Sequence, residues 1–444
     1  MAEDEALDLF ERAHELAVDD ATRTRIRLLQ ALALVRLEDY DRARPELEAL
    51  TPRLEGMDQV KALLGLARAS QWTEETTQVI ETAGQALEMA EGLGARELIG
   101  PAMARLSQGH GMRGADGDLE RSVELGERAL ERWVPGSMPE ELPEHDYMLA
   151  HAHYWTGGYE RALELSRAAR DEAVDPSSGE ALLRGSGMEG LLLAAMGRYE
   201  EAIASFDAVI AFGRELGRPV RVLLNYSTTA FREIHDLDEA RRRSEESLTI
   251  KGRSTSFHMP WMNALVDLIH TDVLVGEIGA AETRWRELWD DVLATPAWEQ
   301  WLLAGRMAAL RAHIAMASEG PEATAEWADR AIAMARRVGR VKYEAVARAV
   351  LGRALLPMGR GQDALRELRA AVSGADRLGN PAGRWRARAD LARALYETGD
   401  DEGAEGAFRA AAEIIRDTAA SLAPERAERF TSAPPVAEIL KAVG

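Results

Sequence analysis

The sequence contains no cysteine. This absence excludes disulfide bonds, zinc sites built on thiolates and catalysis by a cysteine nucleophile. Structural disulfides are typical of oxidising compartments. A chain without cysteine therefore fits the cytoplasm, which is the location that we expect.

Long apolar runs are also missing. No stretch approaches the 18 uninterrupted apolar residues of a membrane-spanning helix. The first ten residues, MAEDEALDLF, are acidic and amphipathic, whereas a signal peptide has a basic start and an apolar core. We therefore expect no membrane span and no membrane partner.

Lysine is scarce, and the positive charge comes almost entirely from arginine. Of the 54 basic residues only four are lysine, and the 75 acidic residues bring the formal net charge to −21. A surface of this sign repels nucleic acid and anionic lipid. We therefore expect no nucleic-acid partner.

Motifs that carry known catalytic or metal chemistry are absent as well. The sequence has no G-x-x-x-x-G-K-[ST], no H-E-x-x-H and no G-x-S-x-G. His151 and His153 are two positions apart, and on a helix such residues point about 200° away from each other. They cannot easily bind the same metal ion. The sequence therefore predicts no enzyme, no catalytic residue, no metal site and no cofactor.

One glycine-rich stretch, GHGMRG at 109–114, matches the G-x-G-x-x-G pattern of dinucleotide-binding loops. That pattern needs a strand before it and a helix directly after it. Here a segment with helical spacing precedes it, and the turn-forming residues ADGD follow. The stretch is therefore predicted to be a widened turn between two helices, without a nucleotide.

What the sequence does contain is one unit repeated along its length. LLLAAMGRYEEAIASFDAVIAFGRELGRP (191–219) and RALLPMGRGQDALRELRAAVSGADRLGNP (353–381) share an apolar helix, a glycine turn, a second helix and a Leu-Gly stop. The second helix of each unit has a small or apolar anchor residue, and the anchors recur about every 40 residues: Ala43, Val79, Ser122, Ala162, Ala202, Ala240, Ala281, Ala323, Ala364 and Ala404. Fixed periods of this size indicate a solenoid.

Each unit is predicted to be a helical hairpin. Apolar residues recur at i, i+3, i+4 and i+7 on both helices, so each hairpin has an apolar face that only a neighbouring hairpin can cover. A turn glycine with positive φ would end the first helix, and the candidates are Gly157, Gly197, Gly276, Gly359 and Gly399. Since no alternating strand pattern of useful length is present, we expect an all-α fold.

The repeats resemble the tetratricopeptide repeat (TPR) family. The matching residues are Leu351, Gly352, Gly359 and Ala364, then Gly190, Gly197, Tyr199 and Ala202, and then Leu391, Gly399 and Ala404. The resemblance implies a right-handed superhelical solenoid of about ten helix-turn-helix repeats. The long period and the tail at 428–444 are similar to the TPR arms of bacterial signal-transduction ATPases and of TPR-bearing nucleotide cyclases, which implies an ATPase or cyclase module as a candidate partner.

Prolines suggest how the array is divided. Three prolines within 131–145 indicate a non-helical linker, and residues 251–261 form a second long connector. We therefore predict N-terminal repeats over 1–133, a proline-rich linker over 134–144, the main array over 145–420, and a C-terminal cap and tail over 421–444.

The TPR resemblance also implies where a ligand would bind, because the first helix of each TPR pair lines the concave surface. Counting back from the anchors places the following residues there: Tyr147, His151, Tyr154, Trp155, Asn225, Arg232, Asn263, Asp267, His270, Arg353, Arg386 and Arg393. Aromatic, amide and arginine side chains suit a peptide, a protein segment or a small effector. The three last arginines are predicted to form a basic strip that faces an acidic segment.

Two alternatives stay open at this stage. Tyr147 and Trp155 could pack against the proline-rich linker, and the three arginines could pair with acids on neighbouring helices. We expect a non-enzymatic scaffold or sensor that binds a partner in its groove, in bacterial signalling or transcriptional regulation. A structural or oligomerisation scaffold with an empty groove is the first alternative, and an enzyme with a groove active site is the second.

Overall fold

The computed structural model describes the whole chain except residues 1, 72–75, 172–179, 251–258 and 296. The described residues form 23 α-helices and one short 3-10 helix, with no strand among them. The chain divides into two compact units. The first contains Met1–Ala152 with Pro296–Trp298, and the second contains His153–Thr295 with Glu299–Gly444.

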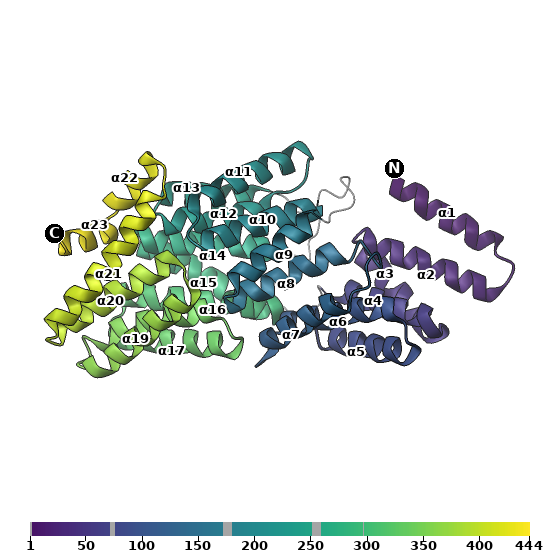
Figure 1. Cartoon of the computed structure of the whole chain (residues 1–444), viewed down its shortest axis with the longest axis horizontal. Coiled ribbons are helices and arrows are strands. Elements are labelled where there is room, and N and C mark those ends of the chain that lie inside the picture. The colour runs from purple at the N-terminus through teal and green to yellow at the C-terminus, as the bar shows by residue number, and fades with distance from the viewer. Residues whose placement is uncertain (1, 72–75, 172–179, 251–258, 296) are drawn as a thin grey trace. The chain divides into compact units, whose positions relative to one another are not determined.

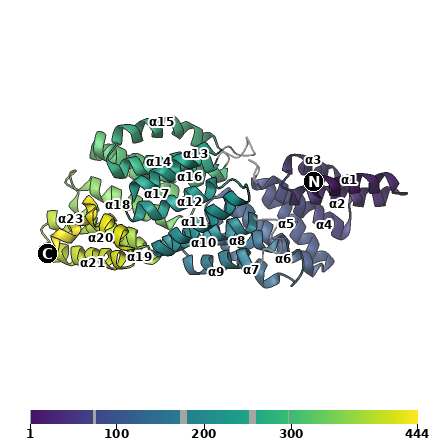
Figure 2. The same cartoon turned by 90° about the horizontal axis from the view of Figure 1, so that it is seen from above.

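The first unit is built from seven helices and the start of an eighth. Its helices from α4 onward pack consecutively, α4 on α5, α5 on α6 and α6 on α7 (Figure 2). The elements are α1 (Ala2–Leu16), α2 (Asp20–Arg36), α3 (Tyr40–Leu50), η1 (Thr51–Arg53), α4 (Gly56–Ser70), α5 (Thr76–Leu93), α6 (Arg96–Arg113), α7 (Asp118–Arg132) and α8 (Leu142–Thr156).

The second unit contains the end of α8 and all later helices. At its end α22 and α23 pack against α21, shown in yellow in Figure 1. The elements are α9 (Tyr159–Asp171), α10 (Glu180–Ala195), α11 (Tyr199–Glu215), α12 (Arg221–Glu233), α13 (Leu237–Thr249), α14 (Met259–Val275), α15 (Ile278–Ala294), α16 (Ala297–Ser318), α17 (Pro321–Arg337), α18 (Val341–Leu355), α19 (Gly361–Leu378), α20 (Pro381–Glu397), α21 (Asp401–Ala420), α22 (Pro424–Ser432) and α23 (Pro434–Ala442).

Helices that follow one another in the chain are packed as pairs, as the sequence predicts. α12 packs on α13, α18 on α19 and α20 on α21. The predicted turn glycines lie between the helices of a pair, and all have positive φ, for example 80° at Gly197 and 73° at Gly359. The prediction of an all-helical repeat solenoid is therefore confirmed.

Nine of the ten predicted anchors are buried, but the eighth was predicted one residue too early. Ala323 is only partly buried, whereas Thr324 is fully buried. In the other repeats with a predicted turn glycine, the second helix begins two residues after that glycine, but α17 begins with Pro321 directly after Gly320. In each case the buried anchor lies three residues after the first residue of the second helix, as Ala202 follows Tyr199, and in α17 that position is Thr324.

The GHGMRG stretch is not the widened turn that the sequence predicts, because α6 continues through its first five residues. The turn begins only at Gly114, where φ is 58°. Gly109 and Gly111 are helical glycines at close contacts, since a Cβ there would lie 2.9 Å from Ile80 Cγ1 and 3.0 Å from Ser122 Oγ respectively. These glycines allow α5 and α7 to approach α6.

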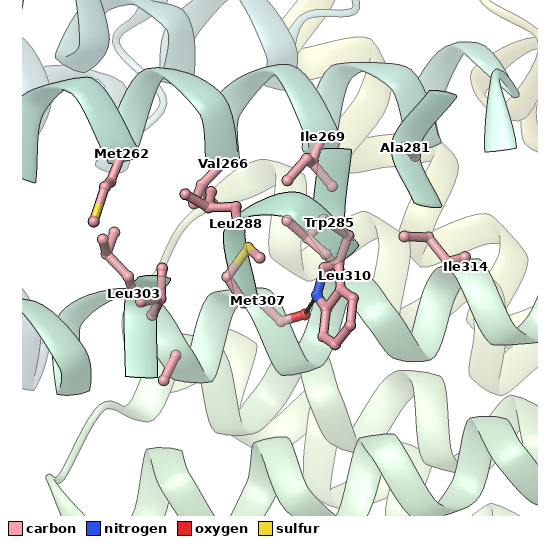
Figure 3. Packing of buried hydrophobic residues seen from close by; sticks show 12 residues of the cluster. Met262, Val266, Ile269, Ala281, Trp285, Leu288, Leu303, Met307, Leu310 and Ile314 are labelled. Carbon is pink, nitrogen blue, oxygen red and sulfur yellow. Dashed lines mark hydrogen bonds between the residues drawn. The ribbon is translucent and has the colours of Figure 1, made fainter. Parts of the chain in front are cut away.

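Tryptophan fills the core between α14, α15 and α16 (Figure 3). Trp285 packs among apolar side chains from the three helices and donates a hydrogen bond from Nε1 to the carbonyl oxygen of Met307 at 2.8 Å. Trp289 stacks on it with ring centroids 4.9 Å apart, and Trp327 meets it edge to face at 5.2 Å. The indole N–H is thus satisfied inside an otherwise apolar cluster.

The proline-rich segment is non-helical over residues 133–141, and α8 begins within it at Leu142. The second predicted connector lies mostly outside the described residues, since α14 begins at Met259. None of the helices in the described ranges combines the length and the apolar character that crossing a membrane requires.

Candidate functional site

The even-numbered helices, on which the predicted site residues lie, form one layer of the second unit. α10 contacts α12, α12 contacts α14 and α18 contacts α20, although another helix separates each of these pairs in the chain. In a curved solenoid the helices on the concave side are closer together than those on the convex side. The even-numbered helices therefore form the inner face.

Asp267 on α14 is the centre of a buried polar cluster on this face. Its Oδ1 accepts from Arg232 at 3.0 Å and from Arg306 at 2.7 Å. Thr228 donates to its Oδ2 at 3.1 Å, and Arg306 also donates to Asn263 Oδ1 at 3.0 Å. Two guanidinium groups thus share one carboxylate, which leaves an excess of positive charge where little water reaches.

Glu233, the last residue of α12, joins this face to distant parts of the same unit. It accepts hydrogen bonds from Lys342 on α18 at 3.2 Å, from Asn380 at 3.0 Å and from Tyr199 at 3.1 Å. Burial opposes ionisation of Glu233, but Lys342 and Asn380 outweigh that effect and lower its pKa. Asn380 also donates to the carbonyl oxygen of Ala195 at 2.9 Å, so the first turn of α20 is tied to the end of α10.

Arg386 on α20 is a half-buried cation, on which the carboxylates of Glu233 and Asp390 act from beyond ion-pair distance. Its guanidinium lies 3.4 Å from His235 Nε2 and 5.2 Å from the centroid of the Trp385 ring. Within the described parts of the chain, no carboxylate lies at ion-pair distance from it. A partly desolvated guanidinium has lost some of its hydration and can regain that free energy by binding an anion.

Three histidines face this excess of positive charge and are held neutral. Burial, assisted by Arg386, lowers the pKa of His235 to about 3. Burial, with Arg353 and Arg386, lowers the pKa of His313 to about 3. The pKa of His270 is lowered well below its ordinary value by burial and by nearby arginines that include Arg386. Arg386 acts on all three histidines, so the packing of the inner helices brings these histidines and the arginines close together.

The other two predicted arginines have carboxylate partners. Arg393 pairs with Asp390 at 3.0 Å and with Glu438 of α23 at 2.9 Å. Arg353 reaches the same Asp390 only at 4.0 Å. Burial raises the pKa of Asp390, although the two arginines oppose that effect. The alternative that arginines pair with neighbouring acids therefore describes Arg393 well, Arg353 weakly and Arg386 not at all.

The predicted aromatic residues at the end of α8 take part in ring contacts. The rings of Tyr154 and Tyr159 are 5.8 Å apart, and Trp155 meets Trp301 edge to face at 5.0 Å. Burial raises the pKa of Tyr154 although Lys342 opposes it. These side chains provide apolar area beside the cationic groups.

The remaining predicted residues are placed differently. Tyr147 and His151 belong to the first unit, where their rings meet edge to face at 4.5 Å and His151 Nδ1 lies 3.0 Å from the carbonyl oxygen of Tyr147. Asn225 is buried on α12 and donates to the carbonyl oxygen of Pro260 at 2.6 Å, while its own Oδ1 has no hydrogen-bond partner. The predicted set is thus divided between the two units.

Two inner-face residues that the sequence did not predict, Arg306 and His313, follow from the corrected anchor. Arg306 lies 18 residues before Thr324, as Asn263 lies 18 residues before Ala281. His313 lies 11 residues before the same anchor, the spacing of His270 in its own repeat. Repeat equivalence would therefore have identified both residues, had the anchor been placed correctly.

The linked side chains of the inner face carry a net positive charge. The linked cations are Arg232, Arg306, Arg340, Lys342, Arg353, Arg386 and Arg393, and the carboxylates that they contact are Glu233, Asp267, Asp390 and Glu438. The chain as a whole has a net charge of −21. Positive charge is thus concentrated on this face, which is an arrangement that attracts anions.

Comparison with known proteins places the fold but not the ligand. No protein-family model matches the chain, and no curated protein matches its sequence. A Rap protein complexed with competence and sporulation factor is similar in structure, with a TM-score of 0.50 and 14% identity over 90% of this chain and 99% of that one. Cut9 from the APC/C hetero-tetramer Cut9–Hcn1 is similar with a TM-score of 0.52 and 14% identity over 98% of this chain and 85% of that one.

In all, 203 chains of known structure match, so the architecture is widely shared and cannot by itself identify a function. The identities are too low to carry more than the fold. The chain has the helical-repeat architecture of TPR-containing proteins, and its described residues form 23 helices in sequentially packed pairs.

Proposed function

We propose that the second unit binds an anionic protein segment or peptide on its inner face, and that the chain is a non-enzymatic scaffold or sensor in signalling or regulation. The observation that carries this proposal is the half-buried guanidinium of Arg386, which has no carboxylate at ion-pair distance among the described residues and lies close to histidines that are held neutral.

The chemistry of these groups suits carboxylates. A guanidinium can donate two parallel hydrogen bonds to one carboxylate, and a neutral histidine can donate one more from its ring N–H. The cationic groups extend from α12 to α20, so an extended segment could meet several of them in succession. A protein segment or peptide with spaced acidic side chains therefore fits better than a single small anion.

The similar structures support an interaction role without naming a partner. The Rap protein is held in a complex with competence and sporulation factor, and Cut9 is held in a hetero-tetramer with Hcn1. A scaffold with an empty inner face remains the alternative, because Glu233 already ties this face together through Lys342 and Asn380.

The test uses a fluorescein-labelled octaglutamate peptide and the full-length chain. Binding is measured by fluorescence anisotropy at low and at moderate salt for the wild type and for Arg353→Gln/Arg386→Gln. The matched control is Arg409→Gln/Arg416→Gln, which removes two exposed arginines of α21. Since a charge-assisted hydrogen bond contributes about 1.5–3 kcal/mol, we expect the first variant to bind at least about tenfold more weakly and the control to bind as the wild type does.

Two results would support the alternative of a scaffold whose inner face binds no ligand. Octaglutamate that binds neither the wild type nor the control would leave the inner face without an anionic ligand. A large fall in the melting temperature of Arg353→Gln/Arg386→Gln, with unchanged binding, would make these arginines parts of the fold.

A further inference from the structure

The inner face of the first unit also presents arginines in series. In this unit α2 contacts α4 and α4 contacts α6, so these three helices form its inner layer. Each supplies one arginine to the same region: Arg36 from α2, Arg68 from α4 and Arg105 from α6. Their partners are acids from a single short segment of the chain, residues 140–144.

The two deeper arginines form a tight cluster with this segment. Arg68 pairs with Glu141 at 2.8 Å and with Glu144 at 2.5 Å. Arg105 pairs with the same two carboxylates, at 3.3 Å from Glu144. All four side chains are at most 13% exposed. Burial opposes ionisation of Glu141, but the two guanidinium groups outweigh it and lower the pKa to about 2.

The position of the segment is unusual for a repeat. The start of α8 is separated from α6 in the chain by α7, so the contacts of Arg105 with Glu141 and Glu144 pass over one helix. The contacts of Arg68 reach past α6, and Arg36 reaches still further to Glu140 at 3.1 Å. Residues 140–144 end the non-helical segment and begin α8. Their carboxylates thus contact an arginine on each of three inner helices, as a bound peptide would.

Several hydrogen-bond donors at this site have no acceptor. Arg68 Nε and the side-chain nitrogens of Gln71 and Gln108 are buried without a hydrogen-bond partner, although both amide oxygens accept from Arg105, at 3.1 and 2.6 Å respectively. The site therefore offers more donors than the internal segment uses. A ligand with a further carboxylate or a backbone carbonyl could satisfy them.

We propose that the inner face of the first unit is a binding site for an acidic peptide segment, and that Glu140, Glu141 and Glu144 occupy it as an internal ligand which an acidic partner displaces. This site uses other residues than the one proposed for the second unit and does not depend on it. Without an acidic occupant, two buried guanidinium groups would be uncompensated, so the site favours carboxylates strongly. The tethered segment competes at an effective concentration on the order of millimolar. It therefore lowers the apparent affinity of every external ligand until the segment is released.

The experiment supplies the segment in trans to the full chain. The probe is a fluorescein-labelled peptide with the sequence GSMPEELPEHD of residues 136–146. It is titrated into the wild type and into Glu140→Gln/Glu141→Gln/Glu144→Gln, which releases the internal ligand. We expect the variant to bind at least about tenfold more tightly than the wild type, because it no longer competes with the probe.

Two controls separate this site from general attraction of acidic peptides. The variant Glu88→Gln/Glu91→Gln/Glu120→Gln has the same change in charge at exposed positions of the first unit and should bind as the wild type does. Adding Arg68→Gln and Arg105→Gln to the triple glutamine variant that releases the segment (the releasing variant) should abolish its gain in affinity for the probe. A folded releasing variant that does not gain affinity, or whose gain survives loss of both arginines, would overturn the proposal.

A second measurement needs no variant, should the releasing substitutions unfold the first unit. Hydrogen exchange of the wild type is followed with and without millimolar probe peptide. Displacement predicts faster exchange of the backbone amides at 133–141, whereas unchanged exchange at saturating peptide would overturn the proposal.

Discussion

Replacement of Glu233 by glutamine tests whether one buried carboxylate holds the curved second unit together. Glu233 accepts from Lys342, Asn380 and Tyr199. Glu233→Gln keeps the size of the side chain but removes its charge, and its NH₂ group must then face one of the three donors. The change therefore leaves the half-buried ammonium group of Lys342 without its anion.

The loss in the free energy of unfolding depends on how well water can replace the lost carboxylate. Removing one member of a fully buried ion pair costs about 3–5 kcal/mol. The Lys342 side chain is 25% exposed and that of Glu233 is 8% exposed, so water can recover part of the loss, and we expect a cost of about 2–3 kcal/mol. Glu233→Gln/Lys342→Met should recover at least about 1 kcal/mol, because it removes the stranded charge.

Hydrogen exchange is the appropriate assay, since a chain of two units need not unfold in one step. We expect faster exchange at the end of α12 and in the first turns of α18 and α20, together with a lower urea midpoint. The control is Glu201→Gln, which breaks an exposed pair with Arg198 and should cost less than about 0.5 kcal/mol. Unchanged exchange in Glu233→Gln, or a double variant no more stable than the single one, would show that Glu233 does not hold these helices together.

Three further predictions concern pH, turns and the core. Stability should fall between pH 7 and pH 5, because His235 and His313 have folded pKa values of about 3 and the unfolded chain takes up the protons near pH 6.5. The cost at pH 5 is about 2 kcal/mol per histidine, and a urea midpoint that does not move over this range would contradict it. Gly197→Ala should destabilise the chain more than Gly217→Ala, whose cost we put at about 1–2 kcal/mol. Both glycines have positive φ, but only at Gly197 would the new Cβ clash, with the ring of Pro381; equal urea midpoints of the two variants would argue against this contact. Trp285→Phe should cost about 2 kcal/mol through the lost hydrogen bond and the smaller ring, and a thermal melt like that of the wild type would show that the cluster repacks.

The repeat architecture could be predicted from the sequence because its signals are local. A turn glycine such as Gly359 needs positive φ wherever it occurs, and an anchor such as Ala364 must be small because two helices cross there. These requirements recur about every 40 residues, so they are visible without knowledge of distant contacts. In one repeat the predicted anchor was wrong by one residue, because the alanine Ala323 directly precedes the buried Thr324, and the inner-face residues Arg306 and His313 were therefore not predicted.

The tertiary structure alone decides which charges on the inner face are paired. Arg386 and Arg393 lie seven residues apart on one helix, yet among the residues that the structure describes Arg393 pairs with two carboxylates and Arg386 pairs with none. Glu233 and Lys342 are 109 residues apart in the chain, and no local pattern marks them as partners. The curvature of the stacked helices brings such residues together, and curvature accumulates from packing at every repeat, which no single stretch of sequence specifies.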